Sequence, residues 1–214
     1  NAVAYFGTNA AGGYGTNAGV GRAAADSYHI SGSIAGDFCV ASEGGANFRF
    51  GTSVSGAGTA TRMLIAENGE ITKPSQPAFS VTVNAAQSNL ATGTDVTIVW
   101  GVETIDVGAN FANNTFTAPA TGKYQLNLML RLNNVDSASP YYIVSFFSSN
   151  NNYRFIFDPD FGQDAQYWST TISVLADMDA SDTVYVAVNQ GGGTAQTDVD
   201  GDANYQRFSG YLAC

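Results

Sequence analysis

The sequence predicts an all-β protein, and three observations support this prediction. Between Lys123 and Leu132 the even positions are Tyr or Leu, whereas the odd positions are Lys, Gln, Asn, Met and Arg. Such period-two alternation is typical of a strand with one face in a core and the other outside it. Similar alternation recurs along the chain with turn residues between the strands, and no stretch has a convincing helical period.

Further strands follow at short, regular spacing. Two more alternating faces and three apolar runs share the strand pattern: Val184, Val186 and Val188; Trp168, Thr170, Ile172 and Val174; and residues 141–147, 153–157 and 205–212. This even spacing indicates a β-sandwich or a jelly roll. In the adjacent pairs Tyr141-Tyr142 and Phe146-Phe147, one ring must face away from the core, so we expect it to meet a partner surface.

A series of short motifs in residues 77–214 carries a resemblance to a known family. In chain order the motifs are PAFSV (77–81), DVGANF (106–111), NTFTAP (114–119), TGKY (121–124), DTVYV (182–186) and FSGYL (208–212). Their order resembles the C1q/TNF-like jelly roll. The resemblance implies a jelly-roll sandwich that forms a homotrimeric recognition head, which is a binding module and not an enzyme.

Residues 1–73 predict a different module, a Gly-rich β-stem of short strands and hairpins. Gly-Thr-Asn at 7–9 and again at 15–17 supplies residues that adopt the positive φ angles of tight turns. Such short strands bury too little for a monomeric core, so we expect a trimeric shaft in which identical chains pool their apolar residues. The stretch RMLIAENGEIT at 62–72 predicts a hairpin with Asn68-Gly69 at its turn. This stretch resembles a hairpin found in the C-terminal regions of bacteriophage tail fibres.

Residues 74–77 predict a proline hinge between this stem and a head at 78–214. Pro74 and Pro77 fix φ and remove N–H donors, which makes the segment a stiff, extended connector. Residue 1 is not Met, and we expect it to be an internal position of a longer polypeptide. No apolar run reaches the roughly 18 residues of a membrane span, and the first residues do not resemble a signal peptide, so we expect no membrane insertion.

The charge of the chain argues against one class of partner. The net charge is −10, and residues 77–214 hold four Lys or Arg against thirteen Asp or Glu. Phosphate backbones bind proteins mainly through clustered Lys and Arg, so no nucleic-acid partner is expected, and cations or neutral sugars fit better. The two cysteines, Cys39 and Cys214, fall in different modules, and we expect two free thiols.

Catalytic chemistry has little support in this sequence. His29 is the single histidine, and no serine in a nucleophile context accompanies it, which argues against a Ser-His-Asp or His-metal site. Asp158, Asp160 and Asp164 could supply the two carboxylates of glycoside cleavage, but beside Pro159 they fit a solvated turn better. We therefore expect no enzyme and no required cofactor.

Asp198, Asp200 and Asp202 are candidate ligands for Ca²⁺. Alternate carboxylates in an extended loop project to one side and offer the hard oxygen ligands that this ion prefers. The pattern departs from an EF-hand, because Gly201 precedes the third Asp and Ser209 stands where a bidentate Glu should fall. We expect a solvated acidic loop here. A Ca²⁺ site is the alternative that the resemblance allows, since C1q-like heads in general can bind the ion near the trimer apex and this loop would precede the last strand.

Together these features predict a bacteriophage tail-fibre-like receptor-binding protein on the virion, assembled in the host cytoplasm. Its partners would be a host cell-surface glycan or outer-membrane protein and other virion tail proteins. Three heads on one stem would bind by avidity, since later contacts become intramolecular. Loops carry recognition without disturbing the core, and the candidate receptor-binding residues are Asp158, Asp160, Phe161, Asp164 and Asn204.

Three other functions stay open at the level of sequence. The protein could be a structural virion decoration or a fibre-trimerising cap without its own receptor. It could instead be a polysaccharide-degrading tip. A secreted, lectin-like C1q protein is the third alternative, against which the missing disulfide framework and the phage-like stem argue.

Overall fold

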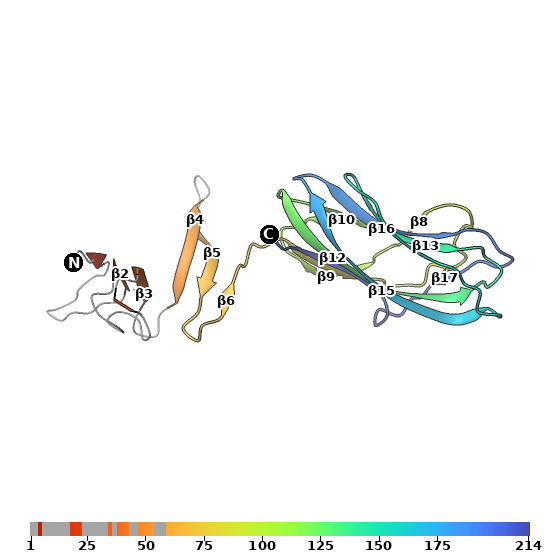
Figure 1. Cartoon of the computed structure of the whole chain (residues 1–214), viewed down its shortest axis with the longest axis horizontal. Helices are drawn as coiled ribbons and strands as arrows, with labels where there is room; N and C mark the ends of the chain where they lie inside the picture. The colour runs from red at the N-terminus through yellow and green to blue at the C-terminus, as the bar shows by residue number, and fades with distance from the viewer. Residues whose placement is uncertain (1–3, 6–17, 23–33, 36–37, 43–46, 54–58) are drawn as a thin grey trace. The chain divides into compact units, whose positions relative to one another are not determined.

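The computed structural model describes residues 4–5, 18–22, 34–35, 38–42, 47–53 and 59–214, and Figure 1 traces the chain. The chain divides into two compact units, Asn1–Ser75 and Gln76–Cys214. Every regular element in the described residues is a β-strand, so the all-β prediction is confirmed for them. His29 lies outside this part of the chain, as does the side chain of Cys39, whereas Cys214 is a free, exposed thiol.

Two small antiparallel sheets make up the described part of the first unit. They are β1 (Ala4–Tyr5), β2 (Ala18–Arg22) and β3 (Phe38–Ser42) in one, and β4 (Phe48–Ser53), β5 (Thr59–Ile65) and β6 (Ile71–Thr72) in the other. The predicted hairpin is confirmed, because β5 and β6 pair and Gly69 takes a φ of 87° at the turn between them. Phe38, Phe50 and Ile71 remain exposed within the single chain.

The second unit, which we call the head, is a sandwich of two six-stranded sheets. The β16 sheet has the order β10-β11-β16-β13-β14, with β8 also paired to β16, and the β12 sheet has the order β15-β12-β18-β7-β9, with β17 also paired to β12. Strands of the β16 sheet are β8 (Val96–Thr97), β10 (Phe111–Ala112), β11 (Thr115–Thr117), β13 (Tyr142–Ser148), β14 (Tyr153–Phe157) and β16 (Thr183–Gln190). Strands of the β12 sheet are β7 (Ala78–Thr82), β9 (Val102–Asp106), β12 (Gly122–Val135), β15 (Ala165–Met178), β17 (Asp198–Val199) and β18 (Arg207–Leu212). The chain crosses repeatedly between the sheets, as in a jelly roll.

The sandwich core forms where the alternating faces meet. The inner face of β12, with Tyr and Leu at the even positions 124–132, is buried as predicted, and its outer face is partly exposed. Phe208 of β18 is fully buried, with its ring centroid 4.8 Å from that of Phe79 and 5.7 Å from that of Phe146. This aromatic cluster joins the two sheets, and apolar burial of this kind supplies most of the stability of a sandwich.

The expectation about the aromatic pairs is confirmed in part. Phe146 faces the core and Phe147 faces away from it, as predicted. The outward ring has a neighbour within the same chain, and its contact with a partner surface stays a prediction. Phe147 stacks on Tyr185 of the same chain with a centroid separation of 5.3 Å, because the antiparallel register of β13 and β16 places these residues opposite each other.

The strand directions define two ends of the head. At one end the first and last residues of the head lie close together. Gln76 Nε2 donates to the carbonyl oxygen of Leu212 at 2.6 Å, and the N–H of Lys123 donates to the carbonyl oxygen of Cys214 at 2.8 Å. The opposite end, which we call the loop end, carries the connections at 83–95, 136–141, 158–164, 191–197 and 200–206. In Figure 1 the C-terminus marks the first of these ends, and the loops around β17 lie at the other.

Candidate functional site

All five candidate receptor-binding residues lie in connections at the loop end and are exposed. Asp158, Asp160, Phe161 and Asp164 belong to the connection between β14 and β15, and Asn204 belongs to the connection between β17 and β18. The first connection is tied to its neighbour, since Asp164 Oδ1 accepts hydrogen bonds from the N–H and Oγ of Ser137 at 2.9 and 2.8 Å. The structure thus places these residues where a large partner could reach them; whether one binds there stays a prediction.

The three candidate Ca²⁺ ligands make separate contacts. Asp198 accepts from the N–H of Asn89 at 2.7 Å and from Nδ2 of Asn134 at 2.9 Å. Asp202 Oδ1 accepts from both the N–H and Nδ2 of Asn204 at 2.9 Å. Among the described residues, no group of three or more His, Cys, Asp or Glu side chains is placed to hold a metal ion. Binding of Ca²⁺ in this segment stays a prediction.

The third of these carboxylates, Asp200, belongs to a cluster that sequence reasoning did not find. We call Arg131, Asn133, Tyr167, Asp200 and Tyr205 the Arg131 cluster. Arg131 Nη2 lies 2.7 Å from Asp200 Oδ2, which also accepts from Asn133 Nδ2 at 2.5 Å. The guanidinium carbon lies 3.5 Å from the ring centroid of Tyr205 and 5.2 Å from that of Tyr167. The cation is therefore held between two aromatic rings and a carboxylate.

Strand register explains why these distant residues meet. β12 pairs with β15 on one side, where Asn133 is opposite Tyr167, and with β18 on the other, where Met129 is opposite Arg207. Tyr167 is thus a diagonal neighbour of Arg131, a separation that long side chains bridge. Tyr205 precedes β18 by two residues, which brings it to the same level of the sheet.

Hydrogen bonds and the opposite charge keep the ion pair ionised, although burial opposes this. Burial raises the pKa of Asp200, but the N–H of Asp202, the amide of Asn133 and the guanidinium of Arg131 lower it by more, so its pKa lies below the ordinary value. Burial lowers the pKa of Arg131, but its hydrogen bond to Asp200 and the charge of that carboxylate raise it by more, so the net shift is upward. Both groups are charged throughout the physiological pH range, and the pair as a whole is neutral.

A second buried carboxylate holds a loop in place. Asp136 is only 1% exposed. Its Oδ2 accepts hydrogen bonds from the N–H of Thr194 and from the N–H of Ala195, the second at 2.7 Å. Its Oδ1 accepts a hydrogen bond from the N–H of Ala138 at 2.8 Å. Burial raises the pKa of Asp136, but these N–H donors lower it by more, and the net shift is downward. Gly193 has a φ of 112°, and a Cβ there would meet Asp136 Oδ2. The 191–197 connection is therefore fixed on the 136–141 connection.

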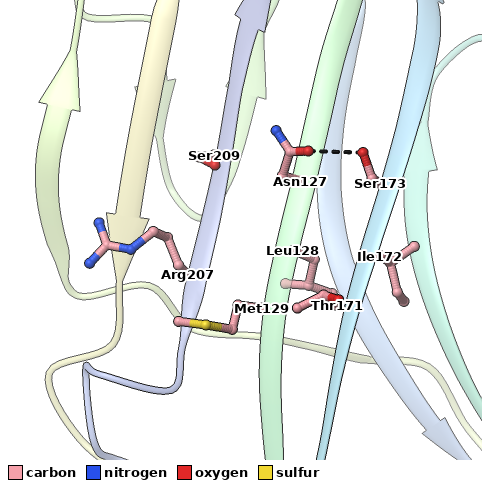
Figure 2. Close-up of a pocket in the computed structure, with 8 residues that line it drawn as sticks. All are labelled: Asn127, Leu128, Met129, Thr171, Ile172, Ser173, Arg207 and Ser209. Carbon is pink, nitrogen blue, oxygen red and sulfur yellow. Dashed lines mark hydrogen bonds between the residues drawn. The ribbon is translucent and has the colours of Figure 1, made fainter.

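The outer face of the β12 sheet carries a shallow depression next to the Arg131 cluster. Its volume is about 230 Å³, and it is lined by Asn127, Leu128, Met129, Thr171, Ile172, Ser173, Arg207 and Ser209. Figure 2 shows that these residues come from β12, β15 and β18 and that Ser173 bonds to Asn127, Oγ to Oδ1 at 2.9 Å. The Arg207 guanidinium extends toward β7, where it donates to Ser80 Oγ at 3.0 Å. No carboxylate among the described residues pairs with it.

The open edge of the sandwich is a further candidate surface. There β14 and β15 are the last strands of the two sheets, and Phe157 stacks on Trp168 across them with ring centroids 3.8 Å apart. β15 is 14 residues long, and Asp177 is its only charged residue. Ile156 of β14 is 61% exposed. Proteins normally protect edge strands with charges, prolines or short length, and β15 has only its single Asp among these features.

No family model and no curated protein matches this chain. Among solved structures, the chain is similar to the globular domain of zebrafish complement 1qA protein, at 18% identity and a TM-score of 0.48 over 65% of this chain and 98% of that one. It is also similar to murine APRIL in two crystal structures. At pH 8.0 the identity is 13% and the TM-score 0.47, and at pH 8.5 they are 11% and 0.46, over 64% of this chain and 98% of APRIL in both.

The strand order of the two sheets itself defines the head as a jelly roll. The resemblance of residues 62–72 to tail-fibre regions has no counterpart among these structures and stays a prediction. No helix in the described residues is long and apolar enough to cross a membrane.

Proposed function

We propose that this protein is a homotrimeric receptor-binding protein of the bacteriophage tail-fibre kind, in which copies of the head associate and the loop end binds a host cell surface. The observation that carries this proposal is the long, nearly uncharged edge formed by β14 and β15. An edge of this composition would pair indiscriminately if it stayed open, so a specific partner is needed to cover it. A second copy of the same chain can be this partner, because every copy is produced together with others that have the same edge.

The first unit supports the same association. Phe38, Phe50 and Ile71 are exposed there in the single chain, although apolar side chains of this size normally gain about 1.5–3 kcal/mol each on burial. Three identical chains wound together would bury them jointly. The β5–β6 hairpin is the part that resembles tail-fibre C-terminal regions, and this resemblance supports a place on the virion beside other tail proteins.

The arrangement of the head supports recognition by the loop end. The candidate residues Asp158, Asp160, Phe161, Asp164 and Asn204 are exposed, and the Asp136 contacts hold the neighbouring connection rigid. A rigid surface loses less conformational entropy on binding than a mobile one. Three such surfaces on one particle appendage would turn weak individual contacts with a glycan or outer-membrane protein into durable attachment by avidity.

The test is the oligomeric state of the whole chain in solution, followed by cell binding. Sedimentation equilibrium is expected to give about three times the chain mass of 22.3 kDa. Ile156→Lys places a charge on the open edge and is expected to shift the protein toward monomer. Val99→Lys is the matched control. Val99 is an exposed apolar residue that follows β8, and β8 pairs with β16 in the same sheet but away from the β14 edge. This variant is expected to leave the trimer intact.

Two outcomes would count against the proposal. A wild-type chain that stays monomeric at every concentration would refute the homotrimer on which the proposal depends. An intact trimer that neither binds host cells nor competes with phage adsorption would favour the structural cap, because that alternative needs the trimer but no receptor. Loss of cell binding on chelation would instead support the Ca²⁺ prediction for Asp198, Asp200 and Asp202.

A further inference from the structure

We propose that the 191–197 connection, held in place by Asp136 and Gln190, is the main receptor contact of the loop end and fits a protein receptor that bears Lys or Arg. The proposal rests on the proposed receptor-binding function, because it names the contact element and the kind of receptor. It is carried by a glycine-rich surface connection that a buried polar network holds in one conformation. None of the five candidate receptor-binding residues belongs to this connection.

Two buried side chains hold the connection from the inside of the head. Asp136 binds two of its N–H groups, as described above. Gln190 is 1% exposed, and its Nε2 donates to the carbonyl oxygens of Gly192 at 2.8 Å and Ala195 at 2.7 Å. Its Oε1 accepts from the N–H of Thr197 at 3.0 Å. The network therefore satisfies backbone groups along most of the connection.

Stability alone does not explain this network. A buried carboxylate or amide is costly to desolvate, and its hydrogen bonds offset that cost with a modest net gain. What a fully paired polar network adds is a single, defined conformation. This matters most in a segment that begins with three consecutive glycines, because glycine has the largest conformational freedom of any residue. A defined conformation favours binding, since less entropy is lost when a partner docks.

The connection crosses the end of the sandwich, away from the edge that a second copy covers. It leaves β16 and enters β17, which belong to different sheets, and β13 separates β16 from the edge strand β14. Gln196 Nε2 donates to the carbonyl oxygen of Leu90 at 3.1 Å, which joins the connection to residues 83–95. Thr194, Ala195 and Gln196 are exposed, so assembly through the β14–β15 edge leaves them open to a receptor.

Charge favours a receptor with Lys or Arg on its surface. The five loop-end connections contain seven Asp and no Lys or Arg. Of these carboxylates, only Asp200 has a cationic partner among the described residues, Arg131. The loop end therefore attracts cationic partners and repels acidic polysaccharides at long range. The 191–197 connection also has no aromatic ring on which a sugar could stack, so a protein loop fits it better than a glycan does.

The experiment measures binding of the labelled full chain to host cells, with sedimentation as the check that each variant stays trimeric. Protease treatment of the cells should abolish binding, and periodate oxidation of their glycans should leave it unchanged. Thr194→Lys and Thr194→Glu add exposed side chains of similar length and opposite charge, and the Lys variant should bind roughly tenfold more weakly than the Glu variant. Ala180→Lys is the matched control and should bind as wild type, because Ala180 is exposed at the opposite end of the head.

Two further variants test whether the network positions the connection. Gly192 has a φ of 141°, and a Cβ there would meet no atom closer than 3.7 Å, so Gly192→Ala strains the backbone without a clash. It should speed hydrogen exchange at the N–H groups of Thr194 and Ala195 and weaken cell binding roughly fivefold, while the amides of β12 exchange as before. Asp136→Asn should have the same two effects in a folded trimer; where it fails to fold, Gly192→Ala decides.

The other outcomes separate this inference from the proposed function. Binding that is lost on periodate treatment and survives protease would refute the protein receptor, and equal weakening by Thr194→Lys and Thr194→Glu would refute its positive charge. Faster exchange with unchanged cell binding would refute the positioning role. Wild-type binding by both Thr194 variants would reject this contact and leave the proposed function intact. A wild-type trimer that binds no host cell would instead refute the proposed function and this inference with it.

Discussion

Replacing Asp136 by Asn should destabilise the head by about 3 kcal/mol. The carboxylate accepts three backbone N–H groups, from Ala138, Thr194 and Ala195, in a site that is 1% exposed. An amide has one acceptor oxygen and one NH₂ group, so at best it satisfies two of these donors and turns its own donors toward the third. A hydrogen bond to a charged group contributes about 1.5–3 kcal/mol, and the bonds that remain lose their charge assistance.

The pH dependence of that difference separates this explanation from a packing defect. The pKa of Asp136 is lowered in the folded protein, so its contribution is fully present above the ordinary carboxyl pKa and is lost as pH falls through the lower folded value. Urea unfolding at one protein concentration should therefore show the full difference near pH 7 and a shrinking one below about pH 4. Asp160→Asn, on an exposed neighbouring loop, should change stability by less than about 0.5 kcal/mol. A difference under about 1 kcal/mol at pH 7, or one that persists unchanged in acid, would refute the argument.

Two further predictions concern the fold. Phe208→Ala removes a fully buried ring that contacts Phe79 and Phe146. It should lower the free energy of unfolding by about 3–5 kcal/mol in the same urea assay. A loss below about 1.5 kcal/mol would contradict the conclusion that this ring is central to the core. Gly69→Ala forces a side chain into a φ of 87° and should weaken the β5–β6 hairpin by about 1 kcal/mol, seen as roughly fivefold faster hydrogen exchange of its amides; unchanged exchange would mean that the turn tolerates Ala.

Local patterns were enough to predict the strands that build the core. Alternation within residues 123–132 depends only on which positions are apolar, and β12 has the predicted inner face. The same holds for β16, where Val184, Val186 and Val188 are buried, and for the Asn68-Gly69 turn. In each of these the information lies within about ten neighbouring residues, which is the range over which side-chain periodicity acts.

The side-chain clusters at the loop end could not be predicted in this way. Arg131 meets Asp200 and Tyr205 because β12 pairs with β17 and β18, and nothing in the local sequence sets that register. The alternation of Asp198, Asp200 and Asp202 predicted that their carboxylates form one set of metal ligands. In the structure each carboxylate instead accepts hydrogen bonds from different residues. One signal was present, since Arg131 is the only cation in the second half of β12 and a buried cation needs a counter-charge, which Asp200 supplies.

The stack of Phe157 on Trp168 gives the molecule a convenient optical property. The chain has only two tryptophans, and Trp100 lies in the core whereas Trp168 lies at the open edge. Emission from Trp168 therefore depends on whether that edge faces water or another chain, while emission from Trp100 depends on whether the sandwich is folded. A Trp100→Phe variant would leave a single intrinsic fluorophore with which assembly could be followed in real time, without any attached dye.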